Sequence, residues 1–339
     1  MLDEAQVRYA ISETNGNKSA AARLLGVPRG TFRKAYARID WDSAPLKNIE
    51  FPQLPDDDIP TTEIIEQMAR RFEKRQKAYR ARQWMTYKVK DKKPIGIAWV
   101  GDPHVDSNGC NWSLLKDHCK VMADTPGLYA ASIGDHTDNW VGRLTRLYSA
   151  SEQSRSTAVR LVEWLLRDSG VKWMLLLRGN HDMWTNNKSD DPVHWIAKGI
   201  GVPTEDWAAR ISLEFPNGRA AKVHAAHNFK GHSMWNSLHG HQKQAHMKEE
   251  AHLYVAGHTH NWALHQEESA SREFTYWLAR CRGYKFLDEY ADVLGHSPQE
   301  GGATICSIFN PDAVNDSGFV QCFADVEQGA DYLTWLRSH

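Results

Sequence analysis

The sequence predicts an α/β protein that carries a small all-helical domain at its N-terminus. From residue 93 onward, short apolar runs alternate with helical segments, and each run ends in a loop rich in Asp, His, Asn and Gly. This alternation is typical of a layered α/β fold with a site at the strand ends. Residues 1–40 instead show the apolar spacing of short amphipathic helices. The chain of 339 residues is about twice as long as a domain of roughly 150 residues, so it has room for both parts.

Composition and charge narrow the functional classes. Hydrophobic residues make up 41% of the chain and charged residues 24%, which excludes a disordered or collagen-like protein. Because the formal net charge is −1, affinity for nucleic acid has to come from a local patch. The five cysteines show no C-x-x-C spacing, which favours reduced thiols over a thiolate zinc site.

Two further sequence features predict the cellular compartment. No apolar run approaches the roughly 20 residues that a membrane span needs, so we expect no membrane partner. The first residues are acidic, unlike a secretory signal. We therefore expect the protein in the cytoplasm.

Three helices are predicted in the N-terminal domain, over residues 2–12, 19–25 and 29–39. Gly26 ends the second helix and Pro28 precedes the third, because glycine suits the end of a helix and proline its first turn. A turn of this length between two short helices is typical of a helix-turn-helix.

Residues 17–34 resemble the helix-turn-helix of the Fis family and of nitrogen-regulator-type activators, with small Ala22 at the helix crossing and Phe32 packing on the core. The resemblance implies DNA binding by the third helix, although a unit that only mediates packing or dimerisation is the alternative. Because such units often bind two half-sites, we also expect a homodimer. The candidate DNA contacts are Arg29, Thr31, Arg33 and Lys34.

A linker and a basic segment follow the N-terminal domain. Residues 41–60 contain four prolines and are predicted as a linker. Residues 61–92 are predicted as a basic connecting segment, and the helix that runs to about residue 83 carries seven Arg and Lys side chains. These charges form either a solvated helix face or a phosphate-tracking surface with Trp84 and Tyr87 available for stacking.

Residues 93–339 are predicted as the catalytic domain. Apolar strands are expected at 95–100, 128–133 and 171–177, with helices at 113–122 and 154–167 between them. After residue 260, a strand around 273–285 carries Arg280, Arg282 and Lys285, which either meet a nucleic-acid backbone or are ordinary edge-strand charges.

Five short motifs concentrate Asp, His and Asn side chains in this domain. The first three directly follow a predicted strand, so their side chains are expected at one edge of the sheet. Carboxylate, imidazole and amide ligands without thiolates suit Mn²⁺, Fe or Zn²⁺. The motifs are Gly101-Asp102-Pro103-His104, Gly134-Asp135 with Asp138-Asn139, Gly179-Asn180-His181-Asp182, residues 223–227, and Gly257-His258-Thr259-His260.

The ordered set resembles the calcineurin-like metallophosphoesterase family over roughly residues 94–263, and its nuclease-like branch of phage or mobile-element type in particular. The resemblance implies a four-layer α/β/β/α sandwich with two divalent metal ions, Mn²⁺ before Fe or Zn²⁺. It implies that one ion is held by Asp102, His104 and His260, the other by Asn180, His227 and His258, and that Asp135 bridges both.

The histidine of the fourth motif has two candidates, His224 and His227. They are three residues apart, so in a strand they point to opposite faces. We favour His227 because it lies at the end of the predicted strand.

The resemblance also implies the chemistry. Two divalent ions clamp a phosphoryl group and acidify a bridging water to hydroxide. His181 then protonates the leaving group while Asp138 orients its ring, a pairing that supports an imidazolium. Asp182 is an alternative supporting carboxylate.

The function predicted from these features is a DNA nuclease or phosphodiesterase targeted by its helix-turn-helix. Asn139 stands where the phosphoprotein phosphatases of the family carry arginine, which disfavours a phosphoprotein substrate. The alternative is a nucleotide or small-molecule phosphoesterase whose N-terminal domain is regulatory or oligomerising. A third hypothesis is a DNA-binding regulator whose hydrolase domain has lost its activity. The complete set of predicted metal ligands argues against it.

Overall fold

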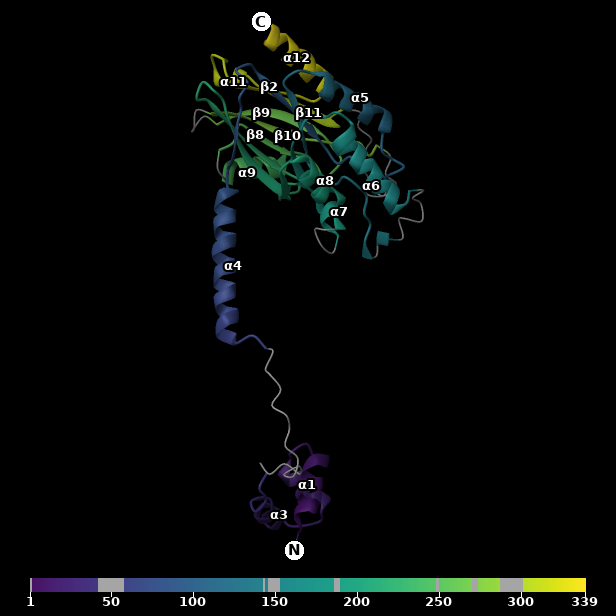
Figure 1. The fold of residues 1–339 in the computed structure, drawn as a ribbon, viewed down its shortest axis with the longest axis vertical. Helices are drawn as coiled ribbons and strands as arrows, with labels where there is room; N and C mark the ends of the chain where they lie inside the picture. Colours follow the sequence, from purple (N-terminus) through teal and green to yellow (C-terminus); the bar gives the residue numbers. More distant parts are fainter. Residues whose placement is uncertain are drawn as a thin grey trace. The chain divides into compact units, whose positions relative to one another are not determined.

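The structure is a computed structural model that describes residues 2–41, 58–142, 144–145, 153–185, 190–247, 250–269, 274–286 and 301–339. The chain divides into two compact units, Met1–Met68 and Ala69–His339 (Figure 1). Most of the predicted linker, residues 42–57, lies outside the described residues. Among the described helices, none combines the length and the apolar character that a bilayer crossing requires.

The first unit begins with three short helices, α1 (Glu4–Glu13), α2 (Lys18–Leu24) and α3 (Arg29–Tyr36). Side chains cap two of them: Asp3 accepts from the backbone N of Gln6 and Asn17 accepts from those of Ser19 and Ala20, which satisfies amides at each helix start. The helices enclose a small core of Val7, Ala10, Ala21, Ala22 and Phe32.

The chain directly after α3 stays in contact with the helical core. Trp41, the first residue of the predicted linker, packs on Tyr36 with ring centroids 4.5 Å apart. Its indole N–H also donates to the carbonyl of Tyr36 at 3.1 Å. The aromatic contact fastens the chain after α3 to the helical core.

Helix α4 (Thr61–Ala81) is the basic helix that the sequence predicts, and none of its residues is buried. Besides its basic side chains it exposes large apolar ones, namely Ile64, Ile65, Met68, Phe72 and Tyr79. After it, Arg82 pairs with Glu205 at 2.8 Å, and the chain enters a strand that the sequence did not predict, β1 (Met85–Lys88).

The second unit is built on two six-stranded mixed sheets. One has the order β1, β6 (Ala208–Glu214), β7 (Ala220–Ala226), β8 (Leu253–Ala256), β10 (Phe274–Arg280), β9 (Ala263–Ser269). The other has the order β12 (Val320–Phe323), β11 (Thr304–Phe309), β2 (Ile95–Val100), β3 (Leu128–Ser132), β4 (Trp173–Arg178), β5 (Thr204–Asp206). Strands β2, β3, β4 and β5 run parallel to one another, so their carboxyl ends share one edge.

The main core lies between the two sheets. Ile97, Trp99 and Leu175 of one sheet pack with Ile211 and Val223 of the other, all fully buried. The buried indole N–H of Trp99 donates to the Ser307 hydroxyl at 2.8 Å, so this large side chain leaves no polar group unpaired.

Helices cover the outer faces of both sheets and complete four layers (Figure 1). On the sheet that contains β2, a second apolar cluster joins the strands to α5 (Trp112–Asp124), α6 (Arg155–Glu163), α8 (Pro192–Ile200) and α12 (Val326–Ser338). On the other sheet, α9 (His239–Met247) contributes Ala245 to a third cluster. The α/β/β/α layering that the sequence predicts is thereby confirmed. Short elements complete the unit: a π-helix at Trp164–Asp168, α7 (Asn180–Met183) and α11 (Asp316–Phe319).

Candidate metal centre

The five motifs meet at one edge of the sandwich. The first three follow β2, β3 and β4, and the other two follow β7 and β8 of the facing sheet. Loops at the carboxyl ends of parallel strands are where α/β folds place their sites. The geometry therefore brings together side chains that are up to 158 residues apart in the sequence, between Asp102 and His260.

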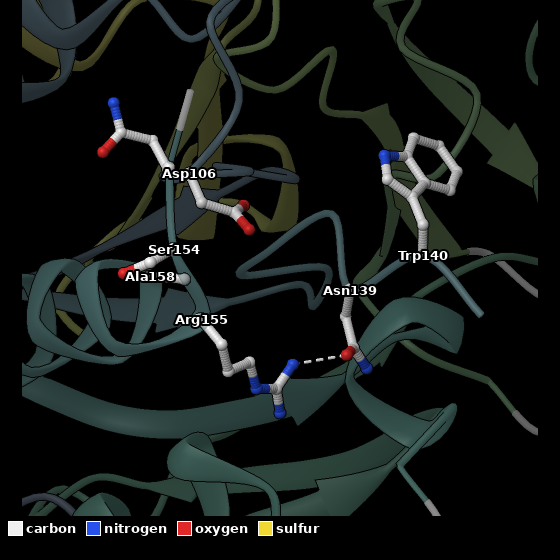
Figure 2. Close-up of a pocket in the computed structure, with 7 residues that line it drawn as sticks. Asp106, Asn139, Trp140, Ser154, Arg155 and Ala158 are labelled. Atoms are coloured by element: carbon white, nitrogen blue, oxygen red, sulfur yellow. Dashed lines mark hydrogen bonds between the residues drawn. The ribbon is translucent and has the colours of Figure 1, made fainter. Parts of the chain in front are cut away.

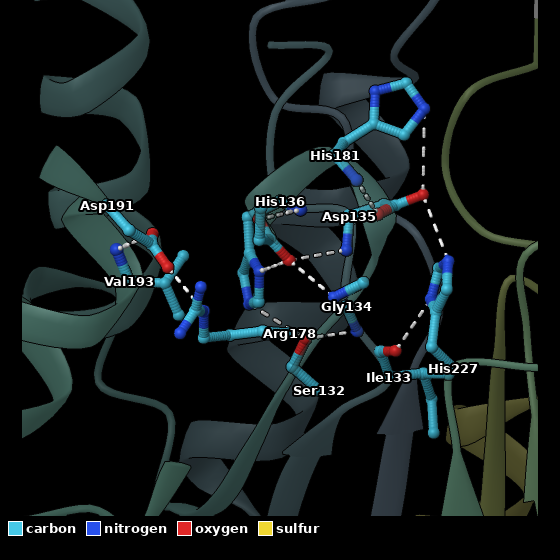
Figure 3. A network of polar contacts seen from close by, with 12 residues as sticks. Ser132, Ile133, Gly134, Asp135, His136, Arg178, His181, Asp191, Val193 and His227 are labelled. Carbon is cyan, nitrogen blue, oxygen red and sulfur yellow. Dashed lines mark hydrogen bonds and ion pairs between the residues drawn. The ribbon is translucent and has the colours of Figure 1, made fainter. Parts of the chain in front are cut away.

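Asp135 lies at the middle of this site (Figure 3). Its Oδ2 is 3.2 Å from Nε2 of His227 and 3.8 Å from Nε2 of His181. Two groups of potential ligand atoms, each within 4.8 Å, overlap at this residue: His104, Asp135 and His181 form one, and Asp135, His227 and His258 form the other. One carboxylate is thus shared by two candidate cation positions.

The remaining predicted ligands surround these groups. Nε2 of His227 lies 2.9 Å from Oδ1 of Asn180 and 3.0 Å from Nδ1 of His258. The ring of His260 is 5.1 Å from that of His104. Asp102 accepts from the backbone N–H of His258 and lies 3.5 Å from Nδ1 of His227. All seven predicted ligand side chains lie in this one site.

The two histidines of the fourth motif take different positions. In β7, Val223 and Ala225 face the core between the sheets, whereas His224 contacts the ring of Phe229 at 5.0 Å on the outer face. His227 follows the strand, and its Nδ1 lies 3.0 Å from the carbonyl oxygen of Ile133. The structure thus places His227, and not His224, beside Asp135.

The site contains buried polar atoms that suit a cation. Oδ1 of Asp102 and Nε2 of His104 are buried and have no hydrogen-bond partner among the described residues. Burying such groups without a partner is costly. A donor set of carboxylate, imidazole and amide oxygen fits divalent Mn, Fe or Zn, so the residues present fit the metal pair.

The glycines of the motifs allow a close approach of the loops. A Cβ on Gly179 would lie 2.1 Å from Oδ1 of Asp135 and 2.7 Å from Cε1 of His227. A Cβ on Gly134 would lie 2.5 Å from the backbone N of Gly179, and its φ of +112° also favours glycine. Any larger residue at either position would separate the loops that carry the ligands.

Backbone strain is concentrated at the same place. Seven non-glycine residues in the described part of the chain have positive φ, and only Asn15 lies in the first unit. Four of the others are predicted ligands: His104 at +40°, Asp135 at +51°, His258 at +74° and His260 at +51°. Such conformations cost about 1–3 kcal/mol each and persist where the surrounding structure enforces them, most often at functional sites.

Charges within the site are coupled. Burial alone would lower the pKa of His227, but the Asp135 carboxylate beside it raises that pKa to about 9. Although burial opposes it, His227 in turn holds the pKa of Asp135 well below its usual range. Burial, with the charge of His227, lowers the pKa of His258 to about 4, and burial raises the pKa of Asp102 to about 6. A proton on His227 therefore balances the shared carboxylate.

His181 and Asp138 interact differently from the sequence expectation. Nδ1 of His181 contacts the backbone carbonyl of Asp138. The Asp138 carboxylate instead lies 2.8 Å from Nδ1 of His104 and 3.1 Å from Nζ of Lys285. Although burial opposes it, these two partners hold the pKa of Asp138 below its usual range. The backbone of Asp138, not its side chain, orients the His181 ring.

A buried carboxylate that follows His181 joins the loops. Asp182 accepts from the backbone N–H groups of Gly179 and Asp135 at 2.9 and 2.8 Å, and its Oδ2 lies 3.1 Å from Nδ1 of His136. Nε2 of His136 lies 2.9 Å from the Ser132 hydroxyl. The sequence analysis did not predict this role for His136. Its position next to Asp135 in the second motif is the one signal that could have indicated it.

Three basic residues near the C-terminal strands also differ from expectation. Arg280, Arg282 and Lys285 are at most 8% exposed. Arg280 donates to the Gly257 carbonyl at 3.2 Å, and Arg282 donates to the Gly301 carbonyl at 2.8 Å. These side chains support the site from inside, so they are neither a surface for a nucleic-acid backbone nor edge-strand charges.

The four candidate DNA contacts lie on α3 in the first unit. Arg29, Thr31, Arg33 and Lys34 are all exposed, whereas Phe32 between them is buried in the helical core. Helix α3 therefore presents these four polar residues to solvent and Phe32 to α1 and α2.

Comparisons with known proteins bear differently on the two units. Residues 5–38 match the family model described as bacterial regulatory protein, Fis family, which confirms the helix-turn-helix. No curated protein matches the chain.

Solved structures are similar to the second unit at low identity. Calcineurin-like phosphoesterase YfkN from Bacillus subtilis is 9% identical with a TM-score of 0.39, over 73% of this chain and 100% of that one. Nuclease MPE from Pseudomonas putida is 15% identical with a TM-score of 0.30, over 67% and 87%. Zinc-complexed Vps29 from Entamoeba histolytica is 11% identical with a TM-score of 0.34, over 68% and 97%. Similarity at this level says nothing about substrate.

Proposed function

We propose that the chain is a metal-dependent phosphoester hydrolase that acts on DNA. The observation that carries this proposal is the pair of buried ligand groups that share Asp135. The exposed polar face of α3, in a unit that matches a Fis-family helix-turn-helix, supports DNA as the substrate.

Seven residues would hold two divalent cations. Asp102, His104 and His260 are proposed for one, Asn180, His227 and His258 for the other, with Asp135 between them. When bound, the cations supply charge that clamps a phosphoryl group and stabilises its transition state, and Mn²⁺ is the first choice for this donor set.

His181 is proposed to give the leaving oxygen its proton. Because Nδ1 faces the Asp138 carbonyl, that nitrogen carries a hydrogen in both protonation states, and Nε2 is the atom that exchanges a proton. Nε2 lies on the Asp135 side of the ring, 3.8 Å from its carboxylate. Burial lowers the pKa of His181, which makes its protonated form a stronger acid.

The test is hydrolysis by the full chain with added Mn²⁺. Labelled single-stranded, double-stranded and nicked DNA would be assayed beside bis-p-nitrophenyl phosphate, with the Asp135→Asn variant as the control. We expect DNA cleavage that the variant lacks. Cleavage of the small ester alone would instead identify a nucleotide or small-molecule phosphoesterase, and hydrolysis of neither substrate would contradict the proposal.

A further inference from the structure

A cavity of about 410 Å³ opens beside the candidate metal centre, between the loop after β3 and the start of α6 (Figure 2). Asn139 links the cavity to the candidate metal centre. It follows Asp138 in sequence, and its amide donates to the His181 carbonyl at 2.6 Å. The cavity is lined by Asp106, Asn139, Trp140, Gln153, Ser154, Arg155 and Ala158.

Arg155 supplies a cation to this cavity. It lies in the first turn of α6, and its guanidinium donates to Oδ1 of Asn139 and to the Asp190 carbonyl, the first of which Figure 2 shows. A guanidinium has five N–H donors in a planar fork that matches phosphate oxygens. These two contacts therefore leave donors for an anionic ligand at the rim of the cavity.

Aromatic rings extend from the proposed proton donor into the same region. The His181 ring contacts Trp140 at 4.9 Å and Trp184 at 4.1 Å between centroids. Nζ of Lys285 lies 5.1 Å from the Trp140 ring. A flat indole near one cation and an arginine across the cavity are the features that bind a base and its phosphate in single-stranded nucleic acid.

We propose that this cavity binds the nucleotide on the leaving-group side of the scissile phosphodiester. Its base stacks on Trp140, and its distal phosphate is bound by Arg155. This inference rests on the proposed function, because a proton donated by His181 puts the leaving oxygen, and the nucleoside attached to it, on the side of the His181 ring. Arg155 and Trp140 are then specificity-determining residues for an oligonucleotide substrate.

The test compares two substrates in the full-length protein with Mn²⁺, a single-stranded oligonucleotide and bis-p-nitrophenyl phosphate. Replacing Arg155→Ala should lower the ratio of kcat/KM for the oligonucleotide to kcat/KM for the small ester about tenfold, the scale of one lost charged contact. Arg160→Ala is the matched control, since Arg160 is an exposed arginine of the same helix outside the cavity, and it should leave the ratio unchanged.

The outcomes separate binding from a purely structural role. If Arg155 only holds Asn139 in place, its loss will slow both substrates equally and the ratio will stay constant, which overturns the proposal. If the wild-type protein hydrolyses DNA only as a duplex, this inference fails while the proposed function stands; if it hydrolyses no DNA, the proposed function itself fails. Loss of one phosphate contact should also reduce the slope of log KM against log salt by about 0.7 for a single strand.

The stacking contact has a separate test. Trp140→Ala should raise KM for the oligonucleotide about fivefold or more, the scale of one base–aromatic stack, and Trp140→Phe should largely restore it. An abasic residue on the leaving-group side should raise the wild-type KM by a similar factor and leave that of Trp140→Ala unchanged. Equal sensitivity of both proteins to the abasic residue would overturn the stacking assignment.

Discussion

The helix-turn-helix and the candidate metal centre are encoded in opposite ways. The helical unit buries its core, Val7 to Phe32, within 26 consecutive residues, and a family model covering residues 5–38 matches it. The metal centre draws its side chains from five loops between Asp102 and His260 and from both sheets. A local unit can be predicted from one continuous stretch of sequence. A site whose residues come from several loops of a sandwich appears in the sequence only as short motifs separated by long intervals.

This difference predicts that the two regions fail separately. Changes in the site should remove hydrolysis and leave DNA binding intact, and changes in α3 should do the reverse.

The largest effect is expected for Asp135→Asn. Because this carboxylate belongs to both ligand groups, its loss should lower turnover of bis-p-nitrophenyl phosphate by about 10³-fold or more, as removal of a central catalytic group does. The matched control is Asp331→Asn, at an exposed position of α12. Near-normal turnover in the Asp135 variant would refute the site assignment.

A smaller loss is expected for Gly179→Ala. The added Cβ would lie 2.1 Å from Oδ1 of Asp135, so the loops that carry the ligands must separate. A displacement of about 1 Å can lower the rate of bis-p-nitrophenyl phosphate hydrolysis about 10²-fold. Gly30→Ala in α3 is the control because its Cβ would meet nothing within 4 Å. Equal rates for the two variants would show that the close approach is not needed.

The affinity of the candidate metal centre for Mn²⁺ should depend on pH. In the metal-free protein the pKa of His227 is raised to about 9, so at neutral pH a cation has to displace its proton. Between pH 6.5 and 8.5 the affinity for Mn²⁺ should therefore rise about tenfold per pH unit, with one proton released. Calorimetry in buffers of different ionisation enthalpy measures this release, and a flat profile would argue against His227 as a ligand.

The smallest effect is expected for Arg33→Ala on α3, the helix proposed to contact DNA. Loss of one phosphate or base contact should weaken DNA binding by about 1–3 kcal/mol and reduce its salt slope by about one. Hydrolysis of the small ester by the same preparation is the internal control. Binding that keeps its full strength and salt dependence would remove Arg33 from the proposed interface.

Sequence patterns predicted the strands that carry the first three motifs better than the edge strands β1 and β5. The runs at β2, β3 and β4 are continuously apolar because these strands are covered on both faces. Strand β1 was not predicted, since its residues alternate between partly buried and exposed, and a half-exposed edge strand depends on its neighbour for its conformation. The three polar residues of β5 gave no signal either.

The same limit applies inside the site. Loop motifs predicted which side chains meet, because the strands before them fix where each loop begins. They did not predict that Lys285 would pair with Asp138, a residue 147 positions away. A buried lysine is stable only with a partner, and that partner is set by the packing of the two sheets, which no local pattern contains.

The positive φ angles at His104, Asp135, His258 and His260 affect which residues selection for stability would favour at these positions. Glycine at these positions would relieve backbone strain of about 1–3 kcal/mol each, so selection for stability alone would erase the site. A lineage that stopped using this chemistry should drift toward glycine or asparagine there and toward a higher melting temperature. The four side chains that help to form the candidate metal centre therefore come at a cost in backbone stability.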